Sequence, residues 1–268
     1  MIPPVVSRLF DQAKGFAAHG TGRNSPVDRR HTPSSSVVWA WEMIQKHHQQ
    51  VRTAVDAGCG RGRNSLFLAR QGVQVTALDF MPGAIAALKA EAQKSGLLDK
   101  IRPLVYDVTE GWPVPERGID LVIDAFCFKH ITGKNMREAY KINLVRALDV
   151  RGLFMIAFAS VGDGYYGKYI TEHVGDGSAL CLDPATNLQS VLFTRDHVVE
   201  FFAPEFRVLE ESTGNVSKPV KGSSTPRLAH ALLFRRNPKS QGNSTMHVKP
   251  EARLLQPRYF GTFKADDR

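Results

Sequence analysis

Cysteine is scarce in this sequence: only Cys59, Cys127 and Cys181 occur among 268 residues. Their scattered positions lack the paired spacing of a disulfide framework or a zinc site, so we expect no structural metal and a reducing, cytoplasmic location. No segment approaches the roughly 20 apolar residues that a membrane-spanning helix needs. Residues 1–10 contain two prolines and no long apolar core, so they do not resemble a signal peptide. We therefore expect no membrane partner.

Acidic residues are outnumbered, with 35 Lys and Arg against 26 Asp and Glu and a net charge of +9. Such an excess attracts anionic partners, including nucleic acid and acidic substrates. However, the sequence has no dense basic run and no signature of an RNA-binding module, so a solvated basic surface is the simpler interpretation. A hydrophobic share of 43% and a mean hydropathy of −0.23 indicate a globular chain.

The N-terminal part is irregular in composition, and residues 21–36 are typical of a loop. Ser35 or Ser36 can cap a helix that runs to about Gln49. From there, strand and helix patterns alternate, which predicts a mostly parallel sheet with helices on both faces. The predicted strands lie at 52–57, 73–78, 101–106, 119–125 and 152–159, and the predicted helices at 64–71, 81–94 and 135–148.

The pattern loosens after residue 160. A Gly- and Tyr-rich insert at 161–177 suits a mobile loop that closes over a substrate. Thr194 then caps a predicted helix at 195–202, and strands are expected at 206–212 and 227–235. We divide the chain into an N-terminal segment at 1–50 as a candidate substrate lid, an α/β domain at 51–236, and a polar, basic tail at 237–268 that we expect to be flexible.

A glycine-rich turn follows the first predicted strand, in the sequence Val-Asp-Ala-Gly-Cys-Gly-Arg-Gly at 55–62. Glycines accept positive φ and let a ligand approach the backbone, and the N–H groups at the next helix start face such a ligand. A dinucleotide fingerprint would read G-x-G-x-x-G. Here Arg63 occupies the sixth position and the third glycine comes early, at Gly62. An NAD-binding oxidoreductase is therefore the weaker alternative.

Acidic residues accompany three successive predicted strands, as Asp56, Asp79 and Asp107. A carboxylate at Asp79 can accept both hydroxyls of a ribose, a feature that NAD enzymes share. Each acid alone could be a cap or a loop residue. Because the carboxyl ends of parallel strands meet at one edge of a sheet, the three together predict one nucleoside site.

The spacing Asp56-x-Gly58-x-Gly60-x-Gly62 resembles motif I of the class I methyltransferases, which use S-adenosylmethionine. The resemblance covers roughly residues 50–160 well and 194–236 loosely. It implies that Asp56 and the loop serve the methionine end of the cofactor, and that Asp107 accepts a hydrogen bond from the adenine amino group. The residues that it implies in cofactor binding are Asp56, Gly58, Cys59, Gly60, Asn64, Asp79, Phe80, Met81, Asp107, Val108 and Asp124.

Residues 119–126, Ile-Asp-Leu-Val-Ile-Asp-Ala-Phe, resemble motif IV of the same family. Asp124 lies at the carboxyl end of this predicted strand, where open α/β sheets bind ligands. Our hypothesis is that Asp124 and His130 flank the transferred methyl group and that one of them orients or deprotonates the acceptor. His130 has the more suitable intrinsic pKa, although a lone histidine is more often structural.

Residues 60–66 and 75–79 look most like the tellurite-resistance and thiopurine branch, which mostly acts on small molecules. We predict a Rossmann-like fold of about seven strands, the last antiparallel as the family implies, and methyl transfer to O, N or S of a small-molecule acceptor. Aromatic residues in the helix before the domain and in the insert would enclose a flat or cationic acceptor. A methyltransferase acting on RNA or protein is the alternative, although no Asn-Pro-Pro-Tyr-like motif follows the fourth strand.

Overall fold

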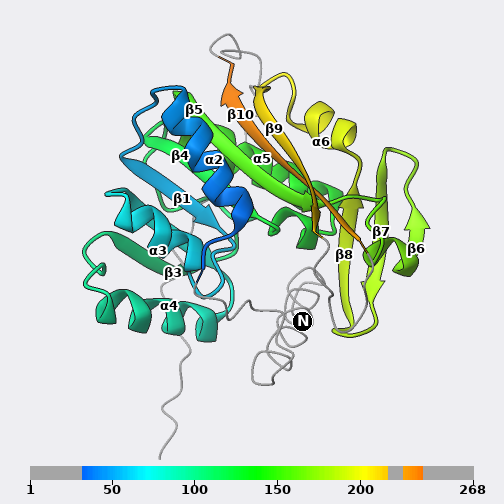
Figure 1. Cartoon of the computed structure of the whole chain (residues 1–268), viewed down its shortest axis with the longest axis horizontal. Coiled ribbons are helices and arrows are strands. Elements are labelled where there is room, and N and C mark those ends of the chain that lie inside the picture. Colours follow the sequence, from blue (N-terminus) through cyan, green and yellow to red (C-terminus); the bar gives the residue numbers. More distant parts are fainter. Residues whose placement is uncertain (1–31, 217–225, 238–268) are drawn as a thin grey trace, which may run out of the picture.

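The computed structural model describes residues 32–216 and 226–237, so most of the candidate lid and nearly all of the predicted tail lie outside the described residues. Its centre is a seven-stranded sheet with the order β3-β2-β1-β4-β5-β10-β9 (Figure 1). The strands are β1 (Thr53–Ala57), β2 (Gln74–Asp79), β3 (Ile101–Val105), β4 (Ile119–Ala125), β5 (Leu148–Ala159), β9 (Phe206–Val216) and β10 (Arg227–Arg236).

Strands β3, β2, β1, β4 and β5 pair in parallel, as the alternation of strands and helices predicts. Strand β10 is antiparallel to both β5 and β9, which confirms the expected direction of the last strand. The order changes direction between β1 and β4, so the carboxyl ends of these two strands flank the crevice where open α/β sheets bind ligands.

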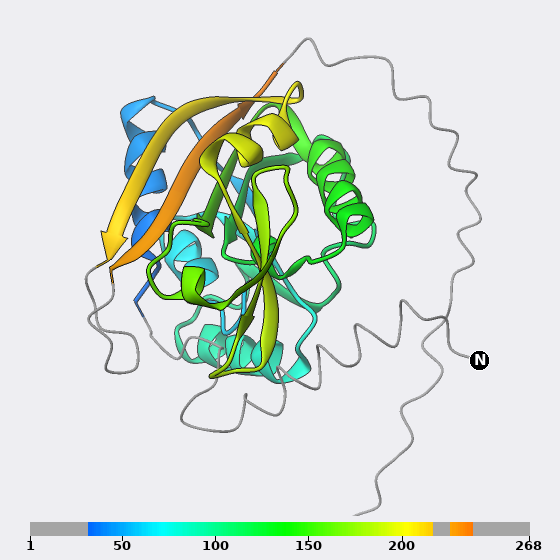
Figure 2. The same cartoon turned by 90° about the vertical axis from the view of Figure 1, so that its right-hand side faces the viewer.

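Helices cover both faces of the sheet (Figures 1 and 2). One apolar core lies under α2, α3 and α4, and the other lies under α5 and α6. Strand β4 contributes to both, with Leu121 and Ile123 in the first core and Val122 in the second, because successive side chains of a strand point to opposite faces. The helices are α2 (Ser35–Lys46), α3 (Arg63–Arg70), α4 (Pro82–Lys94), α5 (Lys134–Ala147) and α6 (Arg195–Phe202).

The helix ends confirm one predicted cap and correct another. Thr194 caps α6, because its side chain accepts a hydrogen bond from the N–H of His197 at 3.1 Å. Helix α2 has Ser34 as its N-cap residue, rather than the predicted Ser35 or Ser36, and ends at Lys46 rather than near Gln49. No helix in the described parts of the chain is long and apolar enough to cross a bilayer.

The insert after β5 forms a second, antiparallel sheet that the sequence analysis did not predict. It consists of β6 (Ile170–His173), β7 (Ser178–Asp183) and β8 (Leu188–Phe193), in that order, preceded by the short 3-10 helix η2 (Tyr166–Tyr169). Figure 2 shows this small sheet in front of the main one. A bridge between Ser160 and Phe193 joins it to the carboxyl end of β5. We call residues 160–193 the cap.

One buried carboxylate, that of Asp163, binds the start of the cap to the main sheet. Asp163 accepts hydrogen bonds from the backbone N–H groups of Tyr165 and Tyr166, at 3.0 and 2.8 Å. It also accepts from the N–H of Leu228 and forms an ion pair with Arg227, both at 2.9 Å. These bonds join the cap to the first residues of β10, and movement of the insert over a substrate stays a prediction.

Candidate functional site

The glycine loop between β1 and α3 takes a path that only glycine allows. Gly58, Gly60 and Gly62 have φ of 70°, 55° and 79°, a region that other residues rarely adopt. A Cβ at Gly58 would lie 2.5 Å from the side chain of Cys127, and a Cβ at Gly62 would overlap the Leu88 side chain. The backbone therefore presses against α4 and against the turn that follows β4.

Asp79 connects this loop to the end of β2. Its Oδ2 accepts from the N–H of Gly60 at 2.8 Å, and its Oδ1 accepts from the N–H of Met81 at 2.9 Å. The carboxyl is 9% exposed, and burial raises its pKa while these two backbone hydrogen bonds lower it. The predicted ribose-binding acid thus lies directly against the predicted cofactor loop.

Asp56, by contrast, faces into the protein. Its Oδ2 accepts from the hydroxyl of Ser65 at 2.5 Å, and it is 1% exposed. Burial raises the pKa of Asp56 to about 7, against the lowering effect of the Ser65 hydrogen bond. The sequence analysis missed Ser65, which stands in the first turn of α3 and so next to the loop.

Asn64, predicted to contact the cofactor, holds the N-terminal helix in place. Its Oδ1 accepts from the N–H of Ser34 at 2.9 Å, which fastens the start of α2 to the start of α3. Phe80, the predicted cover for a face of adenine, is 37% exposed beside the loop. A contact of Asn64 with the cofactor stays a prediction, and so does one of Phe80.

The third strand tip carries Asp107 and Val108. The Oδ1 atom of Asp107 accepts from both the N–H and the hydroxyl of Thr109, each at 2.8 Å, so the carboxylate also shapes its own turn. The carbonyl of Val108 accepts from the Trp112 indole at 2.8 Å, which holds this turn against the α5 side of the sheet.

Cys127 lies among all four predicted acids, and the sequence analysis gave it no role. Burial raises the pKa of its thiol well above the ordinary value, and the carboxylates of Asp124, Asp79, Asp107 and Asp56 raise it further. Such mutual influence requires proximity, so the structure brings together the acidic residues that the strand tips predict. The contact between Cys127 and Gly58 reveals this position, and the sequence alone does not predict that contact.

Asp124 stands at the carboxyl end of β4 as predicted, but its side chain faces protein donors. It is 0% exposed and accepts from the N–H groups of Cys127 at 2.7 Å and Phe128 at 3.0 Å, and from the hydroxyl of Tyr140 at 2.9 Å. Burial raises its pKa to about 7, and the hydrogen bonds oppose this shift. The carboxylate thus holds the turn after β4, and its contact with an acceptor stays a prediction.

His130 ends the 3-10 helix η1 (Phe128–His130) beneath the cap. Burial lowers the pKa of its imidazole well below the ordinary value, the positive charge of Lys129 lowers it further, and a hydrogen bond with the Gln189 backbone acts in the opposite direction. The ring is therefore neutral at neutral pH, and a catalytic role for it also stays a prediction.

The tryptophans of α2 pack onto the sheet. Trp39 and Trp41 are both partly buried against the core under α2, and Trp41 meets Phe67 edge to face with ring centroids 6.4 Å apart. The sequence predicts that aromatic residues of this helix enclose an acceptor. Both nevertheless contact the core, so packing accounts for them.

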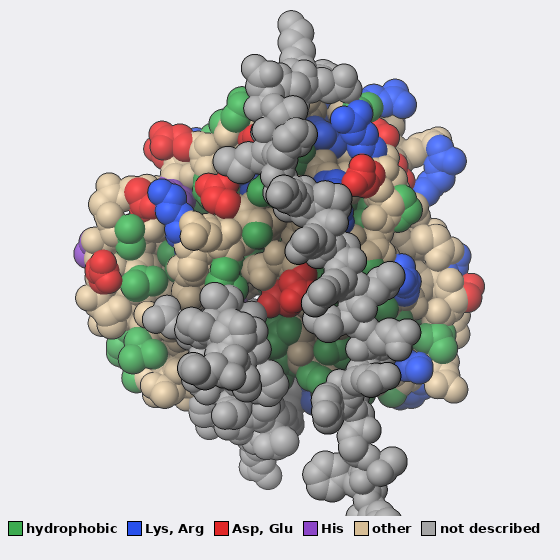
Figure 3. Space-filling view, turned by 180° about the vertical axis from the view of Figure 1, so that it is seen from behind, with side chains coloured by type: hydrophobic (Ala, Val, Ile, Leu, Met, Phe, Trp, Pro, Cys, Tyr) green, Lys and Arg blue, Asp and Glu red, His purple; other side chains and the backbone are tan. Residues whose placement is uncertain are grey.

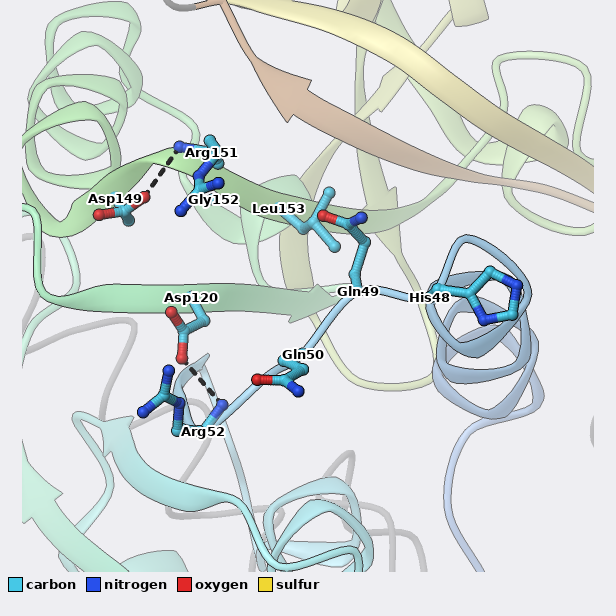
Figure 4. A pocket seen from close by; sticks show the side chains of 9 residues that line it. All are labelled: His48, Gln49, Gln50, Arg52, Asp120, Asp149, Arg151, Gly152 and Leu153. Atoms are coloured by element: carbon cyan, nitrogen blue, oxygen red, sulfur yellow. Dashed lines mark hydrogen bonds between the residues drawn. The ribbon is translucent and has the colours of Figure 1, made fainter.

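A cavity of about 300 Å³ lies at the amino ends of β1 and β4, opposite the glycine loop (Figure 4). Both carboxylates that line it bind backbone N–H groups: Asp120 accepts from the N–H of Arg52 at 2.8 Å, and Asp149 accepts from the N–H of Arg151 at 2.9 Å. It is thus separate from the site described above.

Comparison with known proteins agrees with this geometry. A family model described as a methyltransferase domain matches residues 54–152. A 2-heptyl-1-hydroxyquinolin-4(1H)-one methyltransferase of Mycobacteroides abscessus is 32% identical over 95 residues, which are 35% of this chain and only 40% of that protein.

Among solved structures, a 1,6-didemethyltoxoflavin-N1-methyltransferase of Burkholderia thailandensis, with 1,6-didemethyltoxoflavin and S-adenosylhomocysteine bound, matches with a TM-score of 0.63 at 19% identity, over 88% of this chain and 92% of that one. The [4+2]-cyclase SpnF matches with a TM-score of 0.57 at 13% identity, over 87% of this chain and 96% of that one. These likenesses concern the fold. With the strand order, they show a Rossmann-like fold, in which residues 54–152 match a methyltransferase domain.

Proposed function

We propose that this protein transfers a methyl group from S-adenosylmethionine to an O, N or S atom of a small-molecule acceptor. The observation that carries the proposal is the 2.8 Å hydrogen bond from the N–H of Gly60 to Asp79. This bond holds the glycine loop, which has no bulky side chains at its glycines, against a nearly buried carboxylate. A sulfonium nucleoside needs both: close approach to the backbone and an acceptor for its ribose hydroxyls.

The described residues fit this cofactor. Asp79 uses one lone pair of each oxygen for the backbone, and a carboxylate offers about four acceptor sites, so it can still take ribose hydroxyls. Asp107 would accept from the adenine amino group, the N–H of Val108 would meet the ring, and the half-exposed Phe80 would cover one face. Bound S-adenosylmethionine supplies a methyl group that is already activated on a sulfonium.

The chain's remaining task is to align the acceptor and keep water out. Asp124 and Tyr140 hold the turn after β4, and Cys127 in that turn packs on Gly58. The turn therefore keeps one position relative to the cofactor loop. We retain Asp124 and His130 as candidates for orienting or deprotonating the acceptor, with Asp124 acting through the turn that it holds.

A small molecule is the favoured acceptor on three grounds. The residues at 60–66 resemble a branch that mostly acts on small molecules, and the curated relative is named for a quinolinone. On the face drawn in Figure 3, the described Lys and Arg side chains are interspersed with Asp and Glu, which does not favour the long basic stripe of a nucleic-acid site.

Calorimetry with S-adenosylhomocysteine and NAD, side by side, tests the cofactor. We expect micromolar or tighter binding of S-adenosylhomocysteine and no binding of NAD, and the reverse result would end the proposal. A screen of small acceptors for release of S-adenosylhomocysteine then tests the reaction. Strong cofactor binding with no methyl transfer to any O, N or S acceptor would place the protein with the fold's other uses, such as that of the structural neighbour SpnF, which is a cyclase.

A further inference from the structure

Lys129 is a nearly buried cation in the turn after β4, outside the roles assigned so far. The residue belongs to the 3-10 helix η1 and is only 5% exposed. Its ammonium lies 4.1 Å from the centre of the Tyr166 ring, in the cap. Among the described residues, no carboxylate lies within 4.0 Å of this ammonium.

The nearby carboxylates have other partners. Asp163 is paired with Arg227, whose guanidinium also lies over the Tyr166 ring at 4.5 Å. Asp183 accepts from the Tyr165 hydroxyl at 2.9 Å and from the Thr186 hydroxyl at 3.0 Å. Of the two cations over Tyr166, Arg227 is therefore neutralised within the fold and Lys129 is not.

A buried ammonium without a counter-ion is costly, and a cation–π contact returns only part of that cost. The positive charge of Lys129 also lowers the pKa of the neighbouring His130. Two cations on Tyr166 also argue against the cationic acceptor that the aromatic residues of the insert suggested. The uncompensated charge calls for an anionic ligand.

The position of Lys129 in the fold indicates which ligand would supply the anionic group. It directly follows Phe128, whose N–H is held by Asp124 at the carboxyl end of β4, and it faces the first turn of the cap. In open α/β sheets this edge holds the reacting ligands. A counter-ion for Lys129 would thus lie between the cofactor loop and the cap, where an acceptor must enter.

We propose that Lys129 binds an anionic oxygen of the acceptor, so that the enzyme methylates an acidic small molecule in its ionised form. This inference rests on the proposed function. The acceptor's lone pair forms the new bond to the methyl carbon while the C–S bond breaks and its electron pair stays on sulfur. Sulfonium and anion thereby become a thioether and a neutral methylated product, and no protein base has to remove a proton in this step.

The test compares two ligands that differ in one acidic hydroxyl. Calorimetry on protein saturated with S-adenosylhomocysteine measures 1-hydroxyquinolin-4(1H)-one, at a pH where the N-hydroxyl is ionised, and quinolin-4(1H)-one, which lacks it. We expect the wild type to bind the hydroxylated compound at least tenfold more tightly. Lys129→Gln should lose that preference, by roughly 10- to 100-fold, because a hydrogen bond between charged groups is lost. Lys129→Arg should keep most of it.

The control is Lys168→Gln, at an exposed lysine of η2, which should bind both compounds as the wild type does. Binding of S-adenosylhomocysteine reports the fold of each variant, and Lys129→Met, which keeps the apolar stem, replaces Lys129→Gln if that variant does not fold. The inference is overturned if the wild type shows no preference, including no binding of either compound, or if the preference survives removal of the charge. Failure to bind S-adenosylhomocysteine in the wild type would instead overturn the proposed function.

Discussion

The hydroxyl of Tyr140 donates a hydrogen bond to Oδ2 of Asp124 over 2.9 Å, and so joins α5 to the carboxyl end of β4. The same carboxylate accepts from the backbone of Cys127 and Phe128. Tyr140 is itself held by ring contacts with Phe128 and Trp112, both at 5.5 Å. One buried acid thereby keeps the turn after β4 against the glycine loop.

Replacing Tyr140 by Phe should destabilise the protein by about 1.5–3 kcal/mol, because a buried carboxylate loses a donor. Asp124 has a pKa of about 7 in the folded protein against an ordinary value of 3.8, so the native state binds more protons than the unfolded chain between these values. This group's contribution to stability is full below about pH 4 and is lost as the pH rises through 7. Because the Tyr140 bond lowers that pKa, its removal should cost more at pH 8 than at pH 5, as urea unfolding would measure.

Tyr106→Phe is the matched control for this substitution. The Tyr106 hydroxyl donates to the carbonyl of Gly111 at the surface, with no carboxylate as acceptor, so its removal should cost little and equally at both pH values. An equal loss at pH 5 and pH 8 for Tyr140→Phe would show that the charge of Asp124 does not matter to the bond.

Asp79→Asn should weaken the binding of S-adenosylhomocysteine by about 10- to 100-fold, since an amide has one acceptor oxygen and no charge. Calorimetry gives the dissociation constant. Asp120→Asn makes the same change at the opposite end of the sheet, where Asp120 accepts from the backbone of Arg52 and Thr53, and should leave the affinity unchanged. Unaltered affinity in the Asp79 variant would remove the ribose contact from the site.

Two glycine substitutions separate backbone strain from lack of space. Gly62 and Gly72 have φ of 79° and 90°, but a Cβ meets Leu88 at the first and nothing within 4 Å at the second. Gly72→Ala should therefore cost about 1–2 kcal/mol from the left-handed backbone alone. Gly62→Ala should cost about 1–3 kcal/mol more through the overlap. Thermal unfolding of both variants checks this order, and similar losses would contradict the close approach of α3 to α4.

Much of the domain follows from sequence because buried parallel strands are continuous apolar runs. The prediction for β4 at 119–125 matches the structure at both ends, and the alternation of strands and helices gives the sheet and its direction. The strand tips likewise place Asp56, Asp79, Asp107 and Asp124 near one another, because a parallel sheet brings its carboxyl ends to one edge.

The features that could not be predicted from the sequence depend mostly on contacts between residues far apart in the chain. The insert's glycines indicate a loose loop, and only Arg227, 64 residues beyond Asp163, shows that its start is fastened. Asp124 could be placed at a strand end, but its orientation depends on Tyr140, on a helix face that also suits a plain core residue. The strands β7 and β8 form a short hairpin whose apolar residues are interrupted by polar ones such as Gln189 and Ser190, a pattern weaker than that of the main sheet.

His130→Gln should leave unchanged any loss of rate toward low pH (the acidic limb of the pH–rate profile). The buried imidazole has a pKa well below its ordinary value, so it is already neutral where a general base near neutrality would have to change its charge. Steady-state rates from pH 5 to pH 9, for wild type and variant with the same acceptor, measure this. If the limb disappears in the variant, His130 is the titrating group and our catalytic hypothesis for it gains its first support.

The strands of the cap pair with one another, but β8 also fills the main core, because Val191 and Phe193 lie in the apolar cluster under α5 and α6. In evolutionary terms this divides the cap: β8 is tied to the rest of the domain, whereas β6 is largely exposed and can change at little cost to the core. Under the proposed function, variation in β6 would reshape the acceptor side of the site and leave unchanged the strand tips that would face the cofactor.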